Sequence, residues 1–233
     1  METCPPFING KHKKMKKLRP KVYVYGAGIL VAVIAFLLYY FFFTDFSKRT
    51  EIAYVYIDND DTRDSVITKL QNIGTSHSIT GFGTLMRHWG YDGDKVRTGR
   101  YAVEPGESTF TLFRRLKNGM QSPINLTIPE SRTIERLSGA LSHRLMLDSV
   151  EIADKFTDSS YCAKYGYDTA TLMALFIPDT YEVYWNISLD KLIEKMVKGN
   201  KHFWNDQRIS KAAKIGLSPI EVATLASIID EET

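Results

Sequence analysis

Cysteine is nearly absent from this sequence of 233 residues, which contains only Cys4 and Cys162. The two lie on either side of a long apolar run, so they cannot pair if that run crosses a membrane, and we expect no internal disulfide. Two cysteines are also too few for a cysteine-ligated metal site. The five histidines show none of the spacings that bind zinc, so the sequence predicts neither a metal nor another cofactor.

A strong charge of one sign is also lacking, because 30 basic residues oppose 27 acidic ones and leave a formal net charge of +3. Much of the basic character lies in one place, the arm of residues 1–21, which is rich in lysine between Lys11 and Lys21. A basic cluster beside a membrane is typical of a topology signal or of contact with anionic lipid. We therefore expect membrane lipid, and no nucleic acid, among the partners.

The long apolar run covers residues 22–43 and contains no charged side chain. A run of about 20 apolar residues spans the hydrocarbon core of a bilayer as one helix. Tyrosines near both ends, such as Tyr25 and Tyr39, are typical of the two membrane interfaces. A cleaved signal peptide is the alternative, but the run is too long and no small-residue cleavage motif follows it.

The basic arm also predicts the orientation, since Lys and Arg are retained on the cytoplasmic side. The N-terminus is then cytoplasmic, and the chain from Asp45 onward lies outside the cytoplasmic membrane after a short linker, residues 44–50. A secreted mammalian domain of this size more often carries disulfides. We therefore expect a single-pass protein of the bacterial inner membrane.

Two strand–turn–helix units are predicted within residues 51–124. Residues 52–57 favour a strand that ends in an acidic turn, and Thr62 is placed to cap the helix that follows. The second unit repeats these signals in order: a strand at 100–103, a turn at Pro105-Gly106, an N-cap at Ser108 and a helix stop at Gly119. A further helix is expected near residues 81–88.

After Pro129 the pattern changes to helices. A strand at 122–128 comes first, and apolar residues then recur at steps of three and four, over 134–145, over 189–197 and from Ser218 onward. The sequence therefore predicts an α+β protein that has an N-terminal transmembrane helix, an α/β module over 51–124 and a mostly helical subdomain over 125–233.

The final predicted helix ends in three acidic residues, Asp230, Glu231 and Glu232. Its start is marked by Ser218 as N-cap and by a capping-box glutamate. At about 100° per residue, four residues form a stripe that we expect to be buried: Val222, Leu225, Ala226 and Ile229.

The three acids differ in their position around this helix. Glu232 falls at the edge of the stripe, Glu231 faces away from it and Asp230 is intermediate. A desolvated carboxyl group beside other acids has a raised pKa and suits general-acid catalysis. A glutamate that is salt-bridged, or that snorkels from the edge of the apolar face to solvent, is the ordinary alternative for this pattern.

Three segments carry a resemblance: LTIPESRTIERLSGAL at 126–141, LFIPDTYEVYW at 175–185 and LSPIEVATLASIIDEET at 217–233. In this order they resemble motifs of the YceG-like endolytic murein transglycosylases. The unit at residues 100–119 is similar to the LysM-like module of that family. The membrane anchor with its short basic arm also fits the resemblance.

The resemblance implies a lyase that cuts the β-1,4 bond between N-acetylmuramic acid and N-acetylglucosamine in nascent peptidoglycan and leaves 1,6-anhydro ends. Motif matching assigns the single catalytic glutamate to Glu232, with Asp230 at most in support. Asp179 and Tyr181 are implied to line the cleft; a Pro-Asp turn with Tyr181 packed inward is their structural alternative. Glycan strands are the implied partner, and peptidoglycan synthases are candidate partners.

Family members continue past the Glu-Thr ending, so we expect the chain as written to be truncated and to have little or no activity. Two rival functions stay open. A lysozyme-like lytic transglycosylase would place Ser after the glutamate, where this chain has Thr233. A non-catalytic, membrane-anchored peptidoglycan-binding scaffold would use only the LysM-like module.

Overall fold

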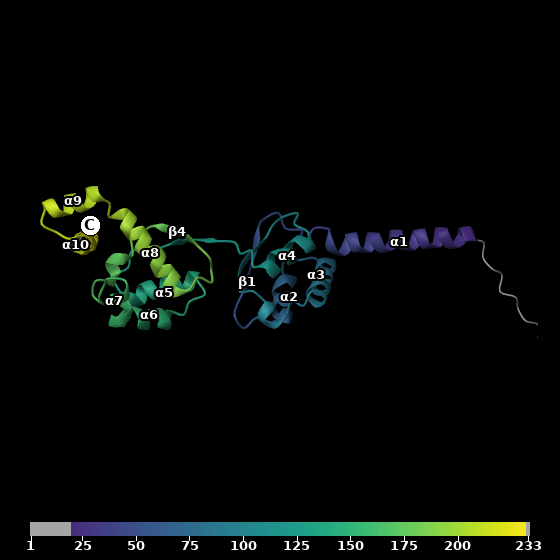
Figure 1. The fold of residues 1–233 in the computed structure, drawn as a ribbon, viewed down its shortest axis with the longest axis horizontal. Helices are drawn as coiled ribbons and strands as arrows, with labels where there is room; N and C mark the ends of the chain where they lie inside the picture. The colour runs from purple at the N-terminus through teal and green to yellow at the C-terminus, as the bar shows by residue number, and fades with distance from the viewer. Residues whose placement is uncertain (1–19, 232–233) are drawn as a thin grey trace, which may run out of the picture.

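The structure is a computed structural model that describes the backbone of residues 20–231 and the side chains of residues 24–229. It is elongated, with a single helix at one end and two folded modules that follow one another along the long axis (Figure 1). The class is mixed α and β, mostly helical with two small sheets, as the sequence predicted. Most of the predicted arm, residues 1–21, lies outside the described residues.

The predicted apolar helix is present as α1, Pro20–Phe42. Its segment Val24–Phe42 is long and apolar enough to cross a membrane, and none of it is buried within the protein. The helix packs its last turn on the first module, where Gly81 approaches the carbonyl of Phe41 so closely that a Cβ atom would overlap it. The rings of Tyr40 and His77 stack beside this contact, with centroids 4.5 Å apart.

The first module is built in the order β1 (Ala53–Ile57), α2 (Arg63–Gln71), α3 (Ser76–His88), a short 3-10 turn η1 (Gly93–Lys95), β2 (Gly99–Val103) and α4 (Thr109–Asn118). The two strands pair antiparallel, with Ala53 opposite Val103 and Ile57 opposite Gly99. Both strands and the helix near residues 81–88 were predicted from the sequence, although their pairing was not.

Local capping explains where these helices begin and end. The Thr62 hydroxyl accepts a hydrogen bond from the Ser65 backbone, and the Ser65 hydroxyl accepts one from Thr62 in return. Ser108 caps α4 through the backbone N–H of Thr111, and Gly119 ends that helix with φ at 68°, a left-handed conformation that favours glycine. The predicted caps at Thr62 and Ser108 and the stop at Gly119 are confirmed.

One hydrophobic cluster fills this module. Leu70 of α2, Phe82 of α3 and Phe113 of α4 pack against the inward side chains of the sheet, which are Val55, Ile57, Tyr101 and Val103. Phe46 is fully buried in the same cluster. The stretch 44–50, expected as a linker, therefore contributes a side chain to the core.

The second module begins with β3 (Ile124–Thr127) and continues through α5 (Ile134–Arg144), α6 (Ser149–Thr157), α7 (Ser159–Lys164), the 3-10 helix η2 (Leu172–Leu175), β4 (Thr180–Val183), α8 (Leu189–Phe203), α9 (Asp206–Lys214) and α10 (Pro219–Glu231). Strands β3 and β4 pair antiparallel, with Ile124 opposite Val183. Strand β4 was not predicted, because four residues that include Glu182 carry too weak a β pattern without the partner strand.

A second hydrophobic cluster lies between α5, α6 and α8, where Leu137, Phe156 and Leu192 are fully buried. The modules meet through side chains near their sheets. The Asn186 amide donates to the Thr98 carbonyl and hydroxyl oxygens, both at 3.1 Å. The division at residues 124 and 125 remains a prediction.

The sequence analysis predicted that the apolar stripe of α10 is buried, and this prediction is wrong. Leu225 and Ile229 are 45% and 58% exposed, Ala226 is also exposed, and Val222 is only half-buried. The helix bends by 76° from α9 and packs chiefly on α9 and on η2. Within the part of the chain that the structure describes, these neighbours leave the stripe largely uncovered, so helical periodicity alone did not predict its exposure.

Candidate functional site

The candidate catalytic helix, α10, begins as the sequence predicted. The Ser218 N–H donates to the Glu221 carboxylate at 2.7 Å, and the Glu221 N–H donates to the Ser218 hydroxyl at 3.3 Å. The bond from the Ser218 N–H to the ionised carboxylate, and then the Ser218 side chain, lower the pKa of Glu221. A capping box fixes the direction in which α10 leaves α9.

The predicted catalytic residue, Glu232, lies outside the described residues. The backbone of Asp230 belongs to the last turn of α10, and its side chain is likewise outside the described set. Their roles therefore stay predictions based on the motif.

Asp179 lies at the entry to β4 and is exposed. Its carboxylate accepts a hydrogen bond from the Thr180 N–H at 2.7 Å, and its carbonyl accepts one from the Ile128 N–H at 2.9 Å. The first bond is local to the start of β4, and the second joins the end of β3 to it. This geometry is that of the turn which the sequence allowed as the alternative role of Asp179.

Tyr181 lies on β4 opposite Leu126 and is half-buried. Its ring rests on α8 at Gly199, where a Cβ atom would lie 2.8 Å from the Tyr181 hydroxyl oxygen. Burial, and then the nearby Asp179 carboxylate, raises the pKa of Tyr181. The phenol therefore stays protonated near neutral pH and can donate a hydrogen bond to a ligand.

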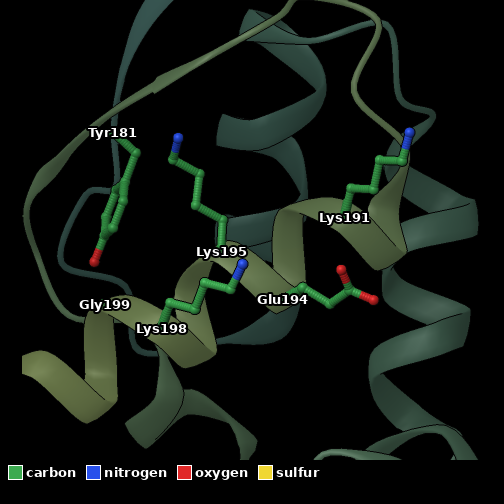
Figure 2. A pocket seen from close by; sticks show the side chains of 6 residues that line it. All are labelled: Tyr181, Lys191, Glu194, Lys195, Lys198 and Gly199. Carbon is green, nitrogen blue, oxygen red and sulfur yellow. The ribbon is translucent and has the colours of Figure 1, made fainter.

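Tyr181 forms one side of a pocket of about 470 Å³ (Figure 2). The other side is one face of α8, with residues at steps of three and four: Lys191, Glu194, Lys195, Lys198 and Gly199. The opposite face of α8 buries Leu192, Ile193 and Met196, which turns these lysines outward. Three ammonium groups against one carboxylate make this pocket suited to an anionic ligand.

The helix that carries these lysines is connected to α10 through η2. The Asn200 amide on α8 donates to the carbonyls of Ala174 and Leu175 at 2.9 and 3.2 Å. The η2 turn in turn packs against α10. Helix α8, which lines the Tyr181 pocket, and helix α10 therefore both contact η2.

The lysine face was missed by sequence reasoning, although its signal was present. Lys191, Lys195 and Lys198 recur at helical spacing; the first two lie within the segment 189–197 that was predicted to be helical, and Lys198 follows it directly. What the pattern did not reveal is that β4 lies against this face, because that strand was not predicted. In the described part of the chain, no group of three His, Cys, Asp or Glu side chains is arranged to hold a metal ion.

Comparison with known proteins gives one match to a family model: the YceG-like family matches residues 55–233. Among solved structures, a crystal structure at 2.6 Å of a YceG-like protein from Listeria monocytogenes is 18% identical, with a TM-score of 0.46. That alignment covers 79% of this chain and 66% of the other, so the chain spans slightly less than two thirds of that protein. No curated protein matches the chain.

Proposed function

The chain belongs to the YceG-like family, whose model matches residues 55–233, and from this premise we propose that it is an endolytic peptidoglycan lytic transglycosylase. The observation that carries the proposal is the extent of this match, which includes the helix leading to Glu232. We propose that the substrate is the glycan strand of nascent peptidoglycan, cut between N-acetylmuramic acid and N-acetylglucosamine.

In the proposed reaction Glu232 acts twice. It first donates its proton to the glycosidic oxygen that leaves with N-acetylglucosamine, and the bond from that oxygen to C1 of N-acetylmuramic acid breaks. The 6-hydroxyl oxygen of the same sugar then bonds to C1, and its proton passes to the Glu232 carboxylate. The atoms balance without water, and the product end is a 1,6-anhydro ring.

The position of this glutamate along the chain supports its role as an acid. Asp230 and Glu231 directly precede Glu232 in the sequence. Negative charges nearby disfavour the ionisation of a further carboxyl group, so these neighbouring acids favour the protonated form of Glu232.

The Tyr181 pocket is proposed to line the substrate cleft. Its lysines suit the carboxylates of the stem peptides that peptidoglycan strands carry, and the protonated Tyr181 hydroxyl suits a sugar or amide oxygen. Asp179 would then act through the strand turn that it stabilises, and Asp230 at most through its proximity to Glu232.

The remaining parts of the chain are proposed to place this activity at the membrane. Helix α1 supports a single-pass anchor, and the basic arm supports a cytoplasmic N-terminus with the modules outside the bacterial inner membrane. We propose that residues 51–124 form a LysM-like module that binds glycan. Peptidoglycan synthases, which make the nascent strands, are the proposed protein partners.

The test uses the protein as its gene encodes it, including any codons that follow Thr233. Uncrosslinked peptidoglycan is digested with this protein, with Glu232→Gln and with Glu231→Gln as the matched control, and product ends are identified by mass spectrometry. Anhydro ends from the first and third proteins, and none from the second, are expected. Reducing ends would contradict the lyase mechanism, and binding without cleavage would favour the scaffold.

A further inference from the structure

A second hollow, of about 660 Å³, lies at the junction between the two modules. The first sheet contributes Tyr54, Tyr56 and Arg100 to its lining, and the second module contributes Glu182 and Trp185. A volume of this size lies within the range of roughly 300–1,000 Å³ that ligand sites occupy. We name this hollow the junction groove; it is separate from the Tyr181 pocket.

The first wall of the junction groove is the outward face of the β1–β2 sheet. Along β1, Val55 and Ile57 point into the core, whereas Tyr54 and Tyr56 point outward and are 40% and 42% exposed. Arg100 stands opposite Tyr56 on β2, and its guanidinium lies 3.4 Å from the centre of the Tyr54 ring. Arg100 therefore covers one face of Tyr54, while Tyr56 is left for other contacts.

The second wall comes from the end of β4. The Trp185 ring lies 5.1 Å from the Tyr56 ring at an interplanar angle of 73°, an edge-to-face contact that joins the modules. Glu182 pairs with Asn125 across the β3–β4 sheet. The groove thus combines two aromatic rings from different modules with a carboxylate and with the guanidinium of Arg100.

Hydrogen bonds hold the groove in place. Those from Asn186 to Thr98 join the two modules, and Arg100 Nη1 donates to the carbonyl of Pro123, directly before β3, at 2.6 Å. Arg100 also lines the groove. A guanidinium held in place in this way is a preformed contact for an oxyanion.

We propose that the junction groove binds a segment of peptidoglycan glycan strand. Sugars present flat apolar faces that pack on aromatic rings, and Tyr56 with Trp185 offers such a platform. The carboxylate of a stem peptide would meet Arg100, and Glu182 would accept hydrogen bonds from sugar hydroxyl groups. The identity of the occupant depends on the proposed function, because only the family match points to peptidoglycan.

The position of the groove gives it a role distinct from cleavage. Helix α10 lies at the end of the second module that faces away from β1 (Figure 1). A strand held in the junction groove is therefore bound at a distance from the proposed catalytic helix. Binding there would retain the strand without occupying the sugars to be cut, which suits an enzyme that cuts within long strands.

The test measures binding by the full-length protein in detergent micelles, with two probes. One is the β-1,4-linked tetramer of N-acetylglucosamine, which has no carboxylate, and the other is uncrosslinked peptidoglycan strands with stem peptides. Tyr56→Ala and Trp185→Ala are compared with Tyr184→Ala, whose side chain is 53% exposed and does not line the groove. Arg100→Gln probes the carboxylate contact, and circular dichroism checks that each variant folds.

Tyr56→Ala and Trp185→Ala are expected to weaken the binding of both probes about tenfold, and Tyr184→Ala to leave it unchanged. Arg100→Gln should weaken only the peptide-bearing strands. Unchanged binding of both probes by the Tyr56 and Trp185 variants would overturn the proposal. If Trp185→Ala does not fold, it is replaced by Trp185→Phe, which retains an aromatic ring. The binding of the two probes by Tyr56→Ala then decides whether the groove is a binding site.

Product ends from the same samples, measured together with Glu232→Gln, separate this proposal from the proposed function. Groove-dependent binding without any anhydro ends would refute the lyase and leave the groove as a glycan site. Anhydro ends that depend on Glu232, with binding unaffected by the groove variants, would refute the groove alone.

Discussion

Helices α4 and α10 share the same pattern of local sequence signals but lie in different environments. Each begins with a serine N-cap and carries an apolar stripe at helical spacing. In α4 the stripe is buried against α3 and the β1–β2 sheet, whereas in α10 Leu225 and Ile229 remain largely exposed. Caps and periodicity therefore establish that a helix forms and where it starts. Burial depends on whether another element covers its apolar face.

The largest expected effect comes from one substitution made in both helices. Leu112→Ala in α4 removes a side chain with 0% exposure and should lower the free energy of unfolding by about 2–5 kcal/mol. Leu225→Ala in α10 should change it by less than about 0.5 kcal/mol, because that side chain is 45% exposed. Urea unfolding of both variants measures the difference, and equal losses would show that the α10 stripe is buried after all.

A second comparison concerns two glycines on α3. A Cβ atom at Gly81 would overlap the Phe41 carbonyl, whereas at Gly83 the nearest atom is the Ile67 Cδ1 at 3.7 Å. Gly81→Ala should therefore loosen the junction with α1 and destabilise it by about 1–3 kcal/mol. Gly83→Ala should stabilise α3 by up to about 1 kcal/mol.

Hydrogen exchange of amides in residues 40–46 and 76–82 is the measurement for the glycine pair. Faster exchange in Gly81→Ala alone would confirm that α1 is docked through this contact. Equal exchange in both variants would mean that the anchor is not held there.

The two caps allow a smaller test. Ser108→Ala should destabilise the first module by about 1 kcal/mol, because the Thr111 N–H loses its acceptor at the start of a helix that packs into the core. Ser218→Ala should mainly increase fraying of α10, with little effect on global unfolding. Thermal unfolding together with residue-level exchange separates the two outcomes, and a large global loss from Ser218→Ala would contradict the comparison.

The sequence predicted elements that depend on local signals. The apolar helix, β1, α4 and its caps at Ser108 and Gly119 follow from residue types at fixed spacings. Strand β4 was missed because its partner β3 lies more than fifty positions earlier in the chain, as the pairing of Thr127 with Thr180 shows. The burial of the α10 stripe was predicted wrongly for the same reason, since helical periodicity does not show whether a distant part of the chain packs against the helix.

For the candidate site, the motifs led to Tyr181, and the structure added its surroundings. The α8 lysines and the junction groove both require knowledge of which elements meet. The pocket needs β4 beside α8, and the groove needs Tyr56 beside Trp185. Residue spacing within one helix or strand does not indicate which other elements pack against it.

The smallest expected effect is the difference in stability between substitutions of two aspartates, Asp61 and Asp190. Burial raises the pKa of Asp61, but hydrogen bonds from Lys69 and Ser65 outweigh it, so the net pKa of this carboxyl group is lowered. A lowered pKa stabilises the fold above the ordinary value of 3.8, and this stability is lost as the pH falls through the lower folded value. The Asp61 side chain is only 6% exposed, so Asp61→Asn should remove up to about 1 kcal/mol at pH 7.

Asp190 is the matched control in the second module. Hydrogen bonds from Tyr165 and then Tyr161 lower the pKa of Asp190, but its side chain is 56% exposed and water screens the interaction. Asp190→Asn should therefore leave unfolding almost unchanged at pH 7. Urea unfolding at pH 7 and pH 3 should show the gap between wild type and Asp61→Asn closing at low pH. A gap that does not narrow at all between pH 7 and pH 3 would mean that Asp61 acts through packing rather than through its charge.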